Sequence, residues 1–179
     1  RMITFDDVEV PISHRLGEEG QGFAIAMEGL DGGRINIATC SVGTAQQALE
    51  DAQAYVSDRK QFGQAIADFQ NTQFKLADMV TELVAARQMI RLAASKLDAG
   101  DSQASTYCAM AKRFATDVGF KVCNDALQLF GGYGYIREYP VERYVRDTRV
   151  HQILEGTNEV MRVIVGRKLM MDGALEVIK

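Results

Sequence analysis

The segment from Gln152 to Glu159 contains the side chain best suited to chemistry, the carboxylate of Glu155. Two apolar residues precede this glutamate, a glycine follows it, and a new helix is expected to begin at Thr157. A carboxylate that is kept away from water becomes strongly basic and can remove a weakly acidic C–H proton. Glu155 is therefore a candidate general base. The alternative is a glutamate that only caps the N-terminus of the following helix, where the helix dipole favours negative charge.

Metal chemistry is not indicated by the sequence. The two histidines, His14 and His151, are too few and too scattered for a convincing ligand set. His151 and Glu155 are four residues apart, as two ligands on one helix would be, but the paired Glu-x-x-His motifs of a di-iron bundle are missing. We predict no metal site.

The composition indicates a helical protein with one principal domain. Of the 179 residues, 47% are apolar and only two are proline, and helix-favouring residues are abundant. A net charge of −4 argues against a nucleic-acid-binding surface, and no apolar run reaches the roughly 18 residues that a membrane span needs. The cysteines lie in apolar helical patterns, which predicts buried thiols in a reducing compartment rather than disulfides: Cys40, Cys108 and Cys123.

Hydrophobic periodicity and turn residues divide the chain into one short strand and a series of helices. Residues 2–10 have the composition of a strand, which Pro11 ends because proline cannot donate to a β-ladder. No later segment has the pattern of a partner strand, so we interpret residues 2–10 as the end of a preceding β-domain. Helices are expected over 23–60, from Asp68 as N-cap to Gly100, over 101–130, over 141–146, and from 157 to about 169.

These elements predict an all-α fold. Three long helices and a final helix of moderate length, joined by short loops, favour an up-and-down four-helix bundle. We assign residues 1–20 to the end of the β-domain and its connector, and residues 21–179 to the helical domain. Such a bundle needs no chemistry of its own, so function must come from the loops and helix ends.

Four segments resemble, in the same order, those of the C-terminal helical domain of the flavin-dependent acyl-CoA dehydrogenases. The resemblance covers nearly the whole chain, and the residues around Glu155 are most similar to those of the short branched-chain, isobutyryl-type members. The four segments are Leu30–Arg34 (LDGGR), Arg59–Gly63 (RKQFG), Gln128–Tyr135 (QLFGGYGY) and Leu154–Glu159 (LEGTNE).

The resemblance implies that Glu155 is the catalytic base. It would remove the α-proton of an acyl-CoA while the β-hydrogen leaves as hydride to FAD, which gives the 2-enoyl thioester. This chemistry requires apolar surroundings that keep water from the carboxylate. Some family members place their base at the position of Gly33, which cannot abstract a proton, and this strengthens the assignment of Glu155. Leu154 stands where many relatives have tyrosine, which leaves the chain-length preference open.

The resemblance also implies binding roles, each with a simpler structural alternative. The predicted substrate contacts are Asp31, Gly32, Gly33, Arg34 and Arg167. Residues 31–34 could instead form a helix kink with an arginine at an interface, and Arg167 could be an ordinary exposed cation of its helix. The predicted FAD contacts, of which 128–132 match the adenosine half, could instead be ordinary helix ends and turns. They are Arg59, Phe69, Gln70, Gln128, Leu129, Phe130, Gly131, Gly132, Thr157, Asn158 and Glu159.

The implied function is that of the C-terminal domain of an FAD-dependent acyl-CoA dehydrogenase for a short acyl-CoA, with α-methyl-branched substrates included. Such enzymes serve fatty-acid or branched-chain amino-acid catabolism, usually as homotetramers that pass electrons to an electron-transferring flavoprotein. They are cytoplasmic in bacteria and lie in the mitochondrial matrix in eukaryotes. The isolated domain is expected to be inactive, because the preceding domain supplies much of the flavin site. The alternatives are an acyl-CoA oxidase or related flavin enzyme, and a non-catalytic helical assembly module.

Overall fold

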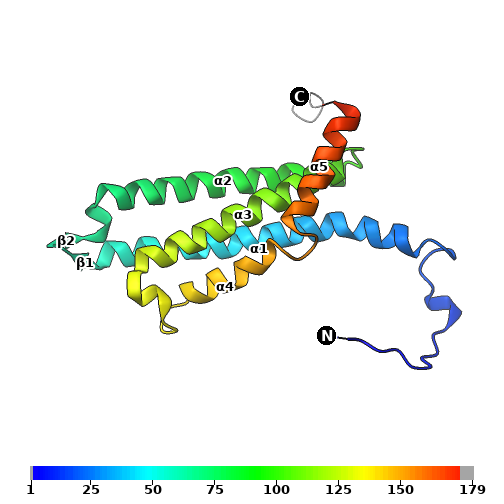
Figure 1. The fold of residues 1–179 in the computed structure, drawn as a ribbon, viewed down its shortest axis with the longest axis horizontal. Helices are drawn as coiled ribbons and strands as arrows, with labels where there is room; N and C mark the ends of the chain where they lie inside the picture. Colours follow the sequence, from blue (N-terminus) through cyan, green and yellow to red (C-terminus); the bar gives the residue numbers. More distant parts are fainter. Residues whose placement is uncertain (1, 174–179) are drawn as a thin grey trace.

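Five α-helices make up most of the chain in the computed structural model, which describes residues 2–173 (Figure 1). The all-α prediction is confirmed. The helices are α1 (Gly22–Asp58), α2 (Gln70–Asp98), α3 (Ala104–Phe130), α4 (Val141–His151) and α5 (Asn158–Asp172). Three short 3₁₀ helices and one hairpin complete the structure: η1 (Ile12–His14), η2 (Ile66–Asp68), η3 (Gly131–Tyr135), and the strands β1 (Lys60–Gln61) and β2 (Gln64–Ala65).

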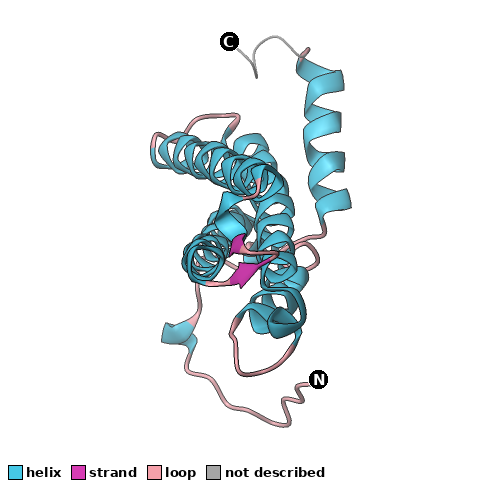
Figure 2. Cartoon of the chain, turned by 90° about the vertical axis from the view of Figure 1, so that its left-hand side faces the viewer, coloured by secondary structure: helices cyan, strands magenta, loops and turns pink. Residues whose placement is uncertain are grey.

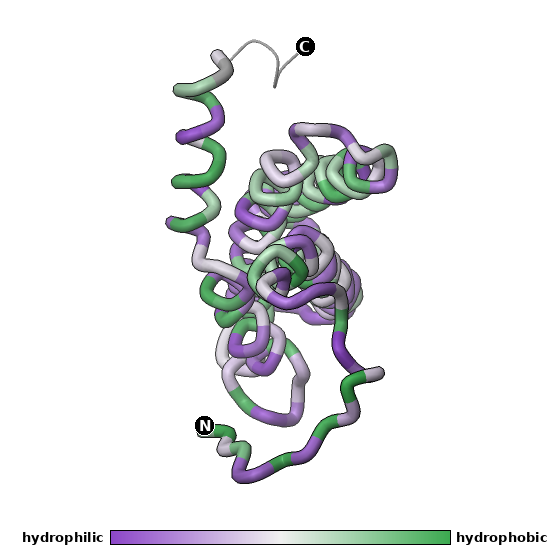
Figure 3. The backbone as a smooth tube through the Cα atoms, turned by 90° about the vertical axis from the view of Figure 1, so that its right-hand side faces the viewer, coloured by the Kyte–Doolittle hydropathy of each residue, from purple (hydrophilic) through white to green (hydrophobic). Residues whose placement is uncertain are grey.

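Helices α1 to α4 form an up-and-down bundle in which α3 is the central member, because it packs against α1, α2, α4 and α5. The fourth bundle helix is α4, which runs to His151 and not only to Arg146 as expected. Helix α5 leaves the bundle and stands beside it (Figure 2). Hydrophobic and hydrophilic residues alternate along this helix (Figure 3). Met161 is buried, whereas Val160 and Val163 are each 47% exposed, so part of the apolar surface of α5 does not pack against this chain.

Small side chains dominate the core and let the helices approach closely. On α1 the fully buried positions include Ala38, Ala45, Ala48 and Ala52, and α3 presents a similar row of alanines. Helices α1 and α3 lie very close together at Gly119, where an added Cβ would lie 2.9 Å from Cβ of Ser41 and 3.0 Å from its carbonyl oxygen. The axes of α1 and α3 could not remain this close with a larger residue at position 119.

Three local predictions are wrong. Residues 2–10 form no strand, because a strand needs a hydrogen-bonded neighbour and the described chain offers this exposed segment none. Asp68 does not cap α2: it lies in η2, and Phe69 is the N-cap residue without a side-chain hydrogen bond. Cys40 is exposed, while Cys108 and Cys123 are buried as predicted.

The hairpin after α1 is a two-residue turn with left-handed backbone at both central positions. Phe62 has a φ of +53° and Gly63 a φ of +83°, as in the turn that matches the twist of a tight β-hairpin. The Phe62 side chain is 94% exposed at the tip. Within the described residues, no helix has the length and apolarity required to cross a bilayer.

Replacing Gly119 with alanine should lower the free energy of unfolding of the full-length protein by about 1–3 kcal/mol, because the new methyl group would push α1 away from α3. The matched control is Gly43→Ala, a helical glycine of α1 with open space around it. This change should raise stability by up to about 1 kcal/mol, since alanine favours helix over glycine. Denaturant unfolding measures both, and equal stability of the two variants would contradict the packing argument.

Candidate active site

Glu155 lies in a tight turn between α4 and α5. Its φ is +55° and that of Gly156 is +87°, so two consecutive residues have left-handed backbone. For a residue with a side chain, such a conformation costs about 1–3 kcal/mol and persists only where the surrounding structure requires it. Gly156 is required for a second reason, since a Cβ there would lie 2.8 Å from Cε of Met161.

The Glu155 carboxylate reaches the backbone of α1 at Gly33. A Cβ on Gly33 would lie 2.5 Å from Oε2 of Glu155 and 3.2 Å from its Cδ. The carboxylate therefore occupies space that only a glycine leaves open. The family resemblance implies a base at the position of either Gly33 or Glu155, and these two residues are in contact. Of the two, only Glu155 has a carboxylate.

Thr157, and not Glu155, caps helix α5. Oγ1 of Thr157 accepts a hydrogen bond from the backbone N–H of Val160 at 3.3 Å. Because the Glu155 side chain is directed to α1, the interpretation of Glu155 as a simple helix cap is wrong.

Glu155 is exposed to solvent in this chain. Its neighbour Leu154 is half-buried, and Ile153 is 51% exposed. The described residues therefore do not form the apolar enclosure that proton abstraction requires. If Glu155 is the base that the resemblance implies, another part of the protein or a ligand must cover this open surface for the chemistry to proceed.

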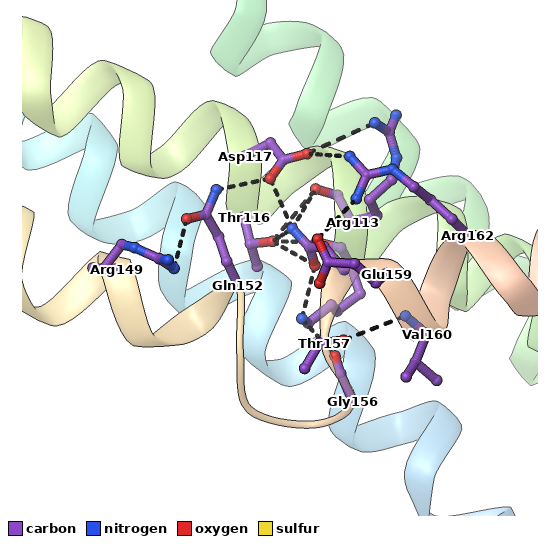
Figure 4. A network of polar contacts seen from close by, with 12 residues as sticks. Arg113, Thr116, Asp117, Arg149, Gln152, Gly156, Thr157, Glu159, Val160 and Arg162 are labelled. Atoms are coloured by element: carbon purple, nitrogen blue, oxygen red, sulfur yellow. Dashed lines mark hydrogen bonds and ion pairs between the residues drawn. The ribbon is translucent and has the colours of Figure 1, made fainter.

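A polar network whose centre is buried at Lys112, Thr116 and Asn158 holds the turn (Figure 4). The fully buried Lys112 of α3 donates hydrogen bonds from Nζ to the carbonyl oxygen of Gly156 and to Oδ1 of Asn158, both at 2.8 Å. Nδ2 of Asn158 donates to Oδ1 of Asp117 at 2.7 Å and to Oγ1 of Thr116 at 3.0 Å. Three residues of α3 thus fix the residue that begins α5.

Asp117 connects this network to the first residue of the turn. Its Oδ1 accepts a hydrogen bond from Nε2 of Gln152 at 2.8 Å, and its Oδ2 lies 3.5 Å from the guanidinium of Arg162 on α5 (Figure 4). The backbone N–H of Asn158 also donates to the carbonyl oxygen of Gln152 at 3.0 Å. Both ends of the turn are therefore joined to each other and to α3.

Burial lowers the pKa of Lys112 to about 8, because the charged ammonium loses its hydration inside the bundle. The carboxylates of Asp117, Glu159 and Glu155 act in the opposite direction, while Arg34 adds to the lowering. Lys112 is therefore mainly protonated at pH 7.

Asp31 and Arg34 pair with each other at the start of the buried part of α1. The guanidinium of Arg34 is 94% buried, donates to Oδ1 of Asp31 at 2.5 Å, and lies 3.4 Å from Oγ of Ser105 on α3. Nε of Arg34 is buried and has no hydrogen-bond partner among the described residues. This placement favours the interfacial alternative for Arg34 over direct contact with the CoA part of a substrate.

The residues predicted to contact the adenosine half of FAD meet in a pocket of about 540 Å³ at the other end of α1. Arg59 and the segment 128–132 line it, and Tyr55, Ile66 and Tyr133 add apolar wall. The guanidinium carbon of Arg59 lies 5.4 Å from the centre of the Tyr133 ring. A planar base and a diphosphate could both find partners on these surfaces.

The remaining predicted contacts are placed less closely together. Phe69 and Gln70 begin α2 beside this pocket but do not line it. Thr157 and Glu159 line a polar pocket of about 290 Å³ next to the turn, and Arg167 is exposed farther along α5. The side chain of Asn158, which is 3% exposed, faces inward and is already hydrogen-bonded, so it acts as internal support rather than as a surface contact.

The two groups of predicted site residues lie far apart within one chain. Gly33, which marks the base, and Arg59, which marks the adenosine pocket, are 26 positions apart on a continuous helix, about 39 Å at 1.5 Å per residue. One dinucleotide cofactor is too short to contact both ends of α1 in the same chain.

Sequence reasoning missed the network residues Lys112, Thr116 and Asp117. A signal was present for the first of them. Lys112 follows Cys108 by four positions and precedes Ala115 by three, so it lies on the apolar face of its helix, where an unpaired lysine is costly. No pattern indicated that Lys112 would bind Gly156 and Asn158, because these two residues lie in a different part of the sequence.

Within residues 2–173, no three histidine, cysteine, aspartate or glutamate side chains are grouped as metal ligands would be. His151 instead lies with Nδ1 2.8 Å from Oγ of Ser41 on α1. This contact gives the histidine a structural partner.

Comparison with known proteins gives consistent matches. The profile of the acyl-CoA dehydrogenase C-terminal domain matches residues 20–170. The mitochondrial isobutyryl-CoA dehydrogenase of Dictyostelium discoideum is 58% identical over 172 residues, which are 96% of this chain and 41% of that protein. Butyryl-CoA dehydrogenase from Megasphaera elsdenii matches with a TM-score of 0.89 and 49% identity, over 93% of this chain and 43% of that one.

A chain in the structure of the electron transferring flavoprotein of Acidaminococcus fermentans matches with a TM-score of 0.90 and 50% identity. The match covers 94% of this chain and 44% of that one. The present chain therefore spans about two-fifths of the length of the proteins it matches.

The lowered pKa of Lys112 predicts a pH-dependent stability. Between about pH 8 and 10.5 the unfolded chain holds a proton on Lys112 that the folded chain has lost. The contribution of Lys112 to the free energy of unfolding therefore rises with pH in this window and is constant below it. Relative to Lys112→Met, the wild-type full-length protein should gain roughly 2–3 kcal/mol between pH 8 and pH 10. Denaturant unfolding at each pH measures the difference, and a difference that stays constant or falls with pH would refute the prediction.

Proposed function

The chain belongs to the acyl-CoA dehydrogenase family as its C-terminal domain, and from this membership we propose that the whole protein oxidises a short acyl-CoA to the 2-enoyl-CoA with FAD. The observation that carries the proposal is the Glu155 carboxylate seated on Gly33. Glu155 has a left-handed backbone conformation, which is costly for a residue with a side chain. Such strained residues are concentrated at functional sites, and this supports a functional role for its carboxylate.

In this proposal, Glu155 accepts the α-proton of the acyl thioester on a carboxylate oxygen. When bound, FAD supplies the acceptor for the β-hydrogen, which leaves as hydride. The backbone N–H of Glu155 donates to no backbone carbonyl among the described residues, so it can donate to the thioester oxygen as negative charge develops there. The turn would thus present both the base and a hydrogen-bond donor.

The residues at the far end of α1 fit the adenosine half of FAD. Arg59 provides a planar cation for a diphosphate, and the exposed backbone at Gly131 and Gly132 permits close approach of a cofactor. Gly131 also ends α3 with a φ of +61°, so its role as a helix terminus and its role in a cofactor site are compatible.

The distance between the two ends of α1 supports an oligomeric enzyme, which we propose to be a homotetramer. Because one FAD cannot contact Glu155 and Arg59 of the same chain, we infer that each cofactor lies between the base of one subunit and the adenosine pocket of another. The predicted contacts Phe69 and Gln70 belong to the same end as Arg59 and would act in the same way.

The proposed substrate is a short acyl-CoA, with the α-methyl-branched isobutyryl group included. The match to an isobutyryl-CoA dehydrogenase supports this choice, and the placement of Leu154 beside the base makes it part of the acyl wall. The proposed electron acceptor is an electron-transferring flavoprotein. An oxidase would instead consume oxygen in step with substrate, which an oxygen electrode distinguishes from reduction of a dye.

Glu155→Gln should lower the rate of flavin reduction in the full-length holoenzyme by about 10²–10⁴-fold, because the amide has the same shape but cannot accept the proton. The measurement is the loss of oxidised-flavin absorbance on mixing with isobutyryl-, butyryl- or 2-methylbutyryl-CoA. Glu138→Gln, an exposed glutamate outside the site, is the matched control. Wild-type rates in Glu155→Gln, or no bleaching of the wild-type enzyme by any of the three substrates, would refute the proposal.

Gly33→Ala should impair turnover without impairing stability. The new Cβ would meet only the end of the flexible Glu155 side chain, which can move away at little cost, but the base is then displaced from its position. A displacement of this size should lower kcat by about 10- to 100-fold. Gly29→Ala, one helical turn earlier with open space around it, should leave kcat unchanged. Equal kcat values for the two variants would show that the contact at Gly33 is not needed.

A further inference from the structure

Lys112 is the largest side chain that is fully buried in this bundle, and nothing in the proposed chemistry uses it. Its ammonium group lies between two oxygens, the carbonyl oxygen of Gly156 and Oδ1 of Asn158. A buried lysine is an unfavourable choice for stability alone, because an apolar side chain of similar volume avoids the loss of hydration. Its position therefore calls for an explanation other than packing.

Both contacts of Lys112 lie at the C-terminal end of the strained part of the turn, one at Gly156 and one at Asn158. The Gly156 carbonyl belongs to the residue directly after Glu155, so its direction sets the orientation of that end of the turn. The Asn158 amide, held by the same ammonium and by Asp117, fixes where α5 begins. A left-handed residue needs such support, because without it the backbone would relax to a commoner conformation.

The sign of the charge is also suited to the site. The ammonium of Lys112 is close enough to Glu155 for the two opposite charges to interact, and Asp117, Glu159 and Arg34 are the other charged groups that act on it. The attraction between these opposite charges helps to hold the carboxylate in place.

We propose that Lys112 is a positioning residue for the proposed dehydrogenation: its ammonium clamps Gly156 and Asn158 and thereby holds the Glu155 carboxylate over Gly33. Asp117 is the second anchor of the clamp, because it holds both Asn158 and Gln152. The expected effect on catalysis rests on the proposed function. The hydrogen bonds by which Lys112 holds the turn do not depend on it.

The test uses Lys112→Met in the full-length holoenzyme. The variant keeps the length of the side chain and removes both hydrogen bonds and the charge. We expect kcat to fall about 10- to 100-fold, as for a small misplacement of a base, with FAD still bound. The KM for the acyl-CoA should stay near the wild-type value, because the clamp positions the base and does not bind the substrate. A variant that is only less stable would keep the wild-type kcat per bound FAD.

Lys121→Met is the matched control on the same helix. The Lys121 side chain is 53% exposed and pairs with Glu82 at 2.7 Å on the surface, so its removal should change neither kcat nor KM. If Lys112→Met does not fold, Asp117→Asn decides the question. This change keeps the volume of the partly buried side chain and weakens the hydrogen bonds that Asp117 accepts from Asn158 and Gln152. It should lower kcat about 10-fold.

Amide hydrogen exchange separates this inference from the proposed function. Residues 153–159 should exchange faster in Lys112→Met or Asp117→Asn than in wild type and Lys121→Met, whether or not the protein oxidises any acyl-CoA. Faster exchange in an enzyme that bleaches with no substrate would refute the function and support the clamp. Unchanged exchange, or a wild-type kcat in a folded variant of Lys112 or Asp117, would overturn the clamp.

Discussion

The site depends on one contact, that of the Glu155 carboxylate with the bare backbone of Gly33. This contact imposes two conditions. Helix α1 must carry no Cβ at that point, and the turn before α5 must be held close to α1. The second condition explains why Glu155 and Gly156 have left-handed backbone, since the turn must reverse within two residues to direct the carboxylate inward. The strain of the turn and the glycine in the opposite helix are therefore two parts of one requirement.

The packing of small residues in the bundle determines how close the turn can lie. Ser41 of α1 packs on Gly119 of α3, and its Oγ is 2.8 Å from Nδ1 of His151, the last residue of α4. Burial lowers the pKa of His151, so the ring is neutral at pH 7 and can share one hydrogen bond with the hydroxyl. The last residue of α4 therefore contacts α1 at the point where α1 packs against α3, four residues before Glu155. The packing of the core thus helps to set the position of the turn.

Local patterns were sufficient to predict the long helices and the turn that carries Glu155 from the sequence. Apolar spacing located the three long helices, and the Leu154–Glu159 segment indicated a helix start at Thr157, which caps α5. Features that depend on distant partners were not predictable in this way. The expected strand at 2–10 had no neighbour to pair with, α5 left the bundle, and the partners of Lys112 are 44 and 46 residues away. A local pattern contains no information about such contacts.

Positioning and desolvation of the proposed base are assigned to different parts of the molecule. Lys112 and Asn158 are buried within this chain and Asp117 is partly buried, so the geometry of the turn is an internal property of the bundle. The carboxylate itself is exposed, and α5 beside it presents unsatisfied apolar surface. Proton abstraction from a thioester requires both a fixed base and a dry one. A substitution inside the bundle can therefore misplace the base without wetting it, and a change in the covering parts can wet the base without moving it. The two kinds of defect differ in their signature, since the first alters the orientation of the reacting groups and the second alters the basicity of the carboxylate.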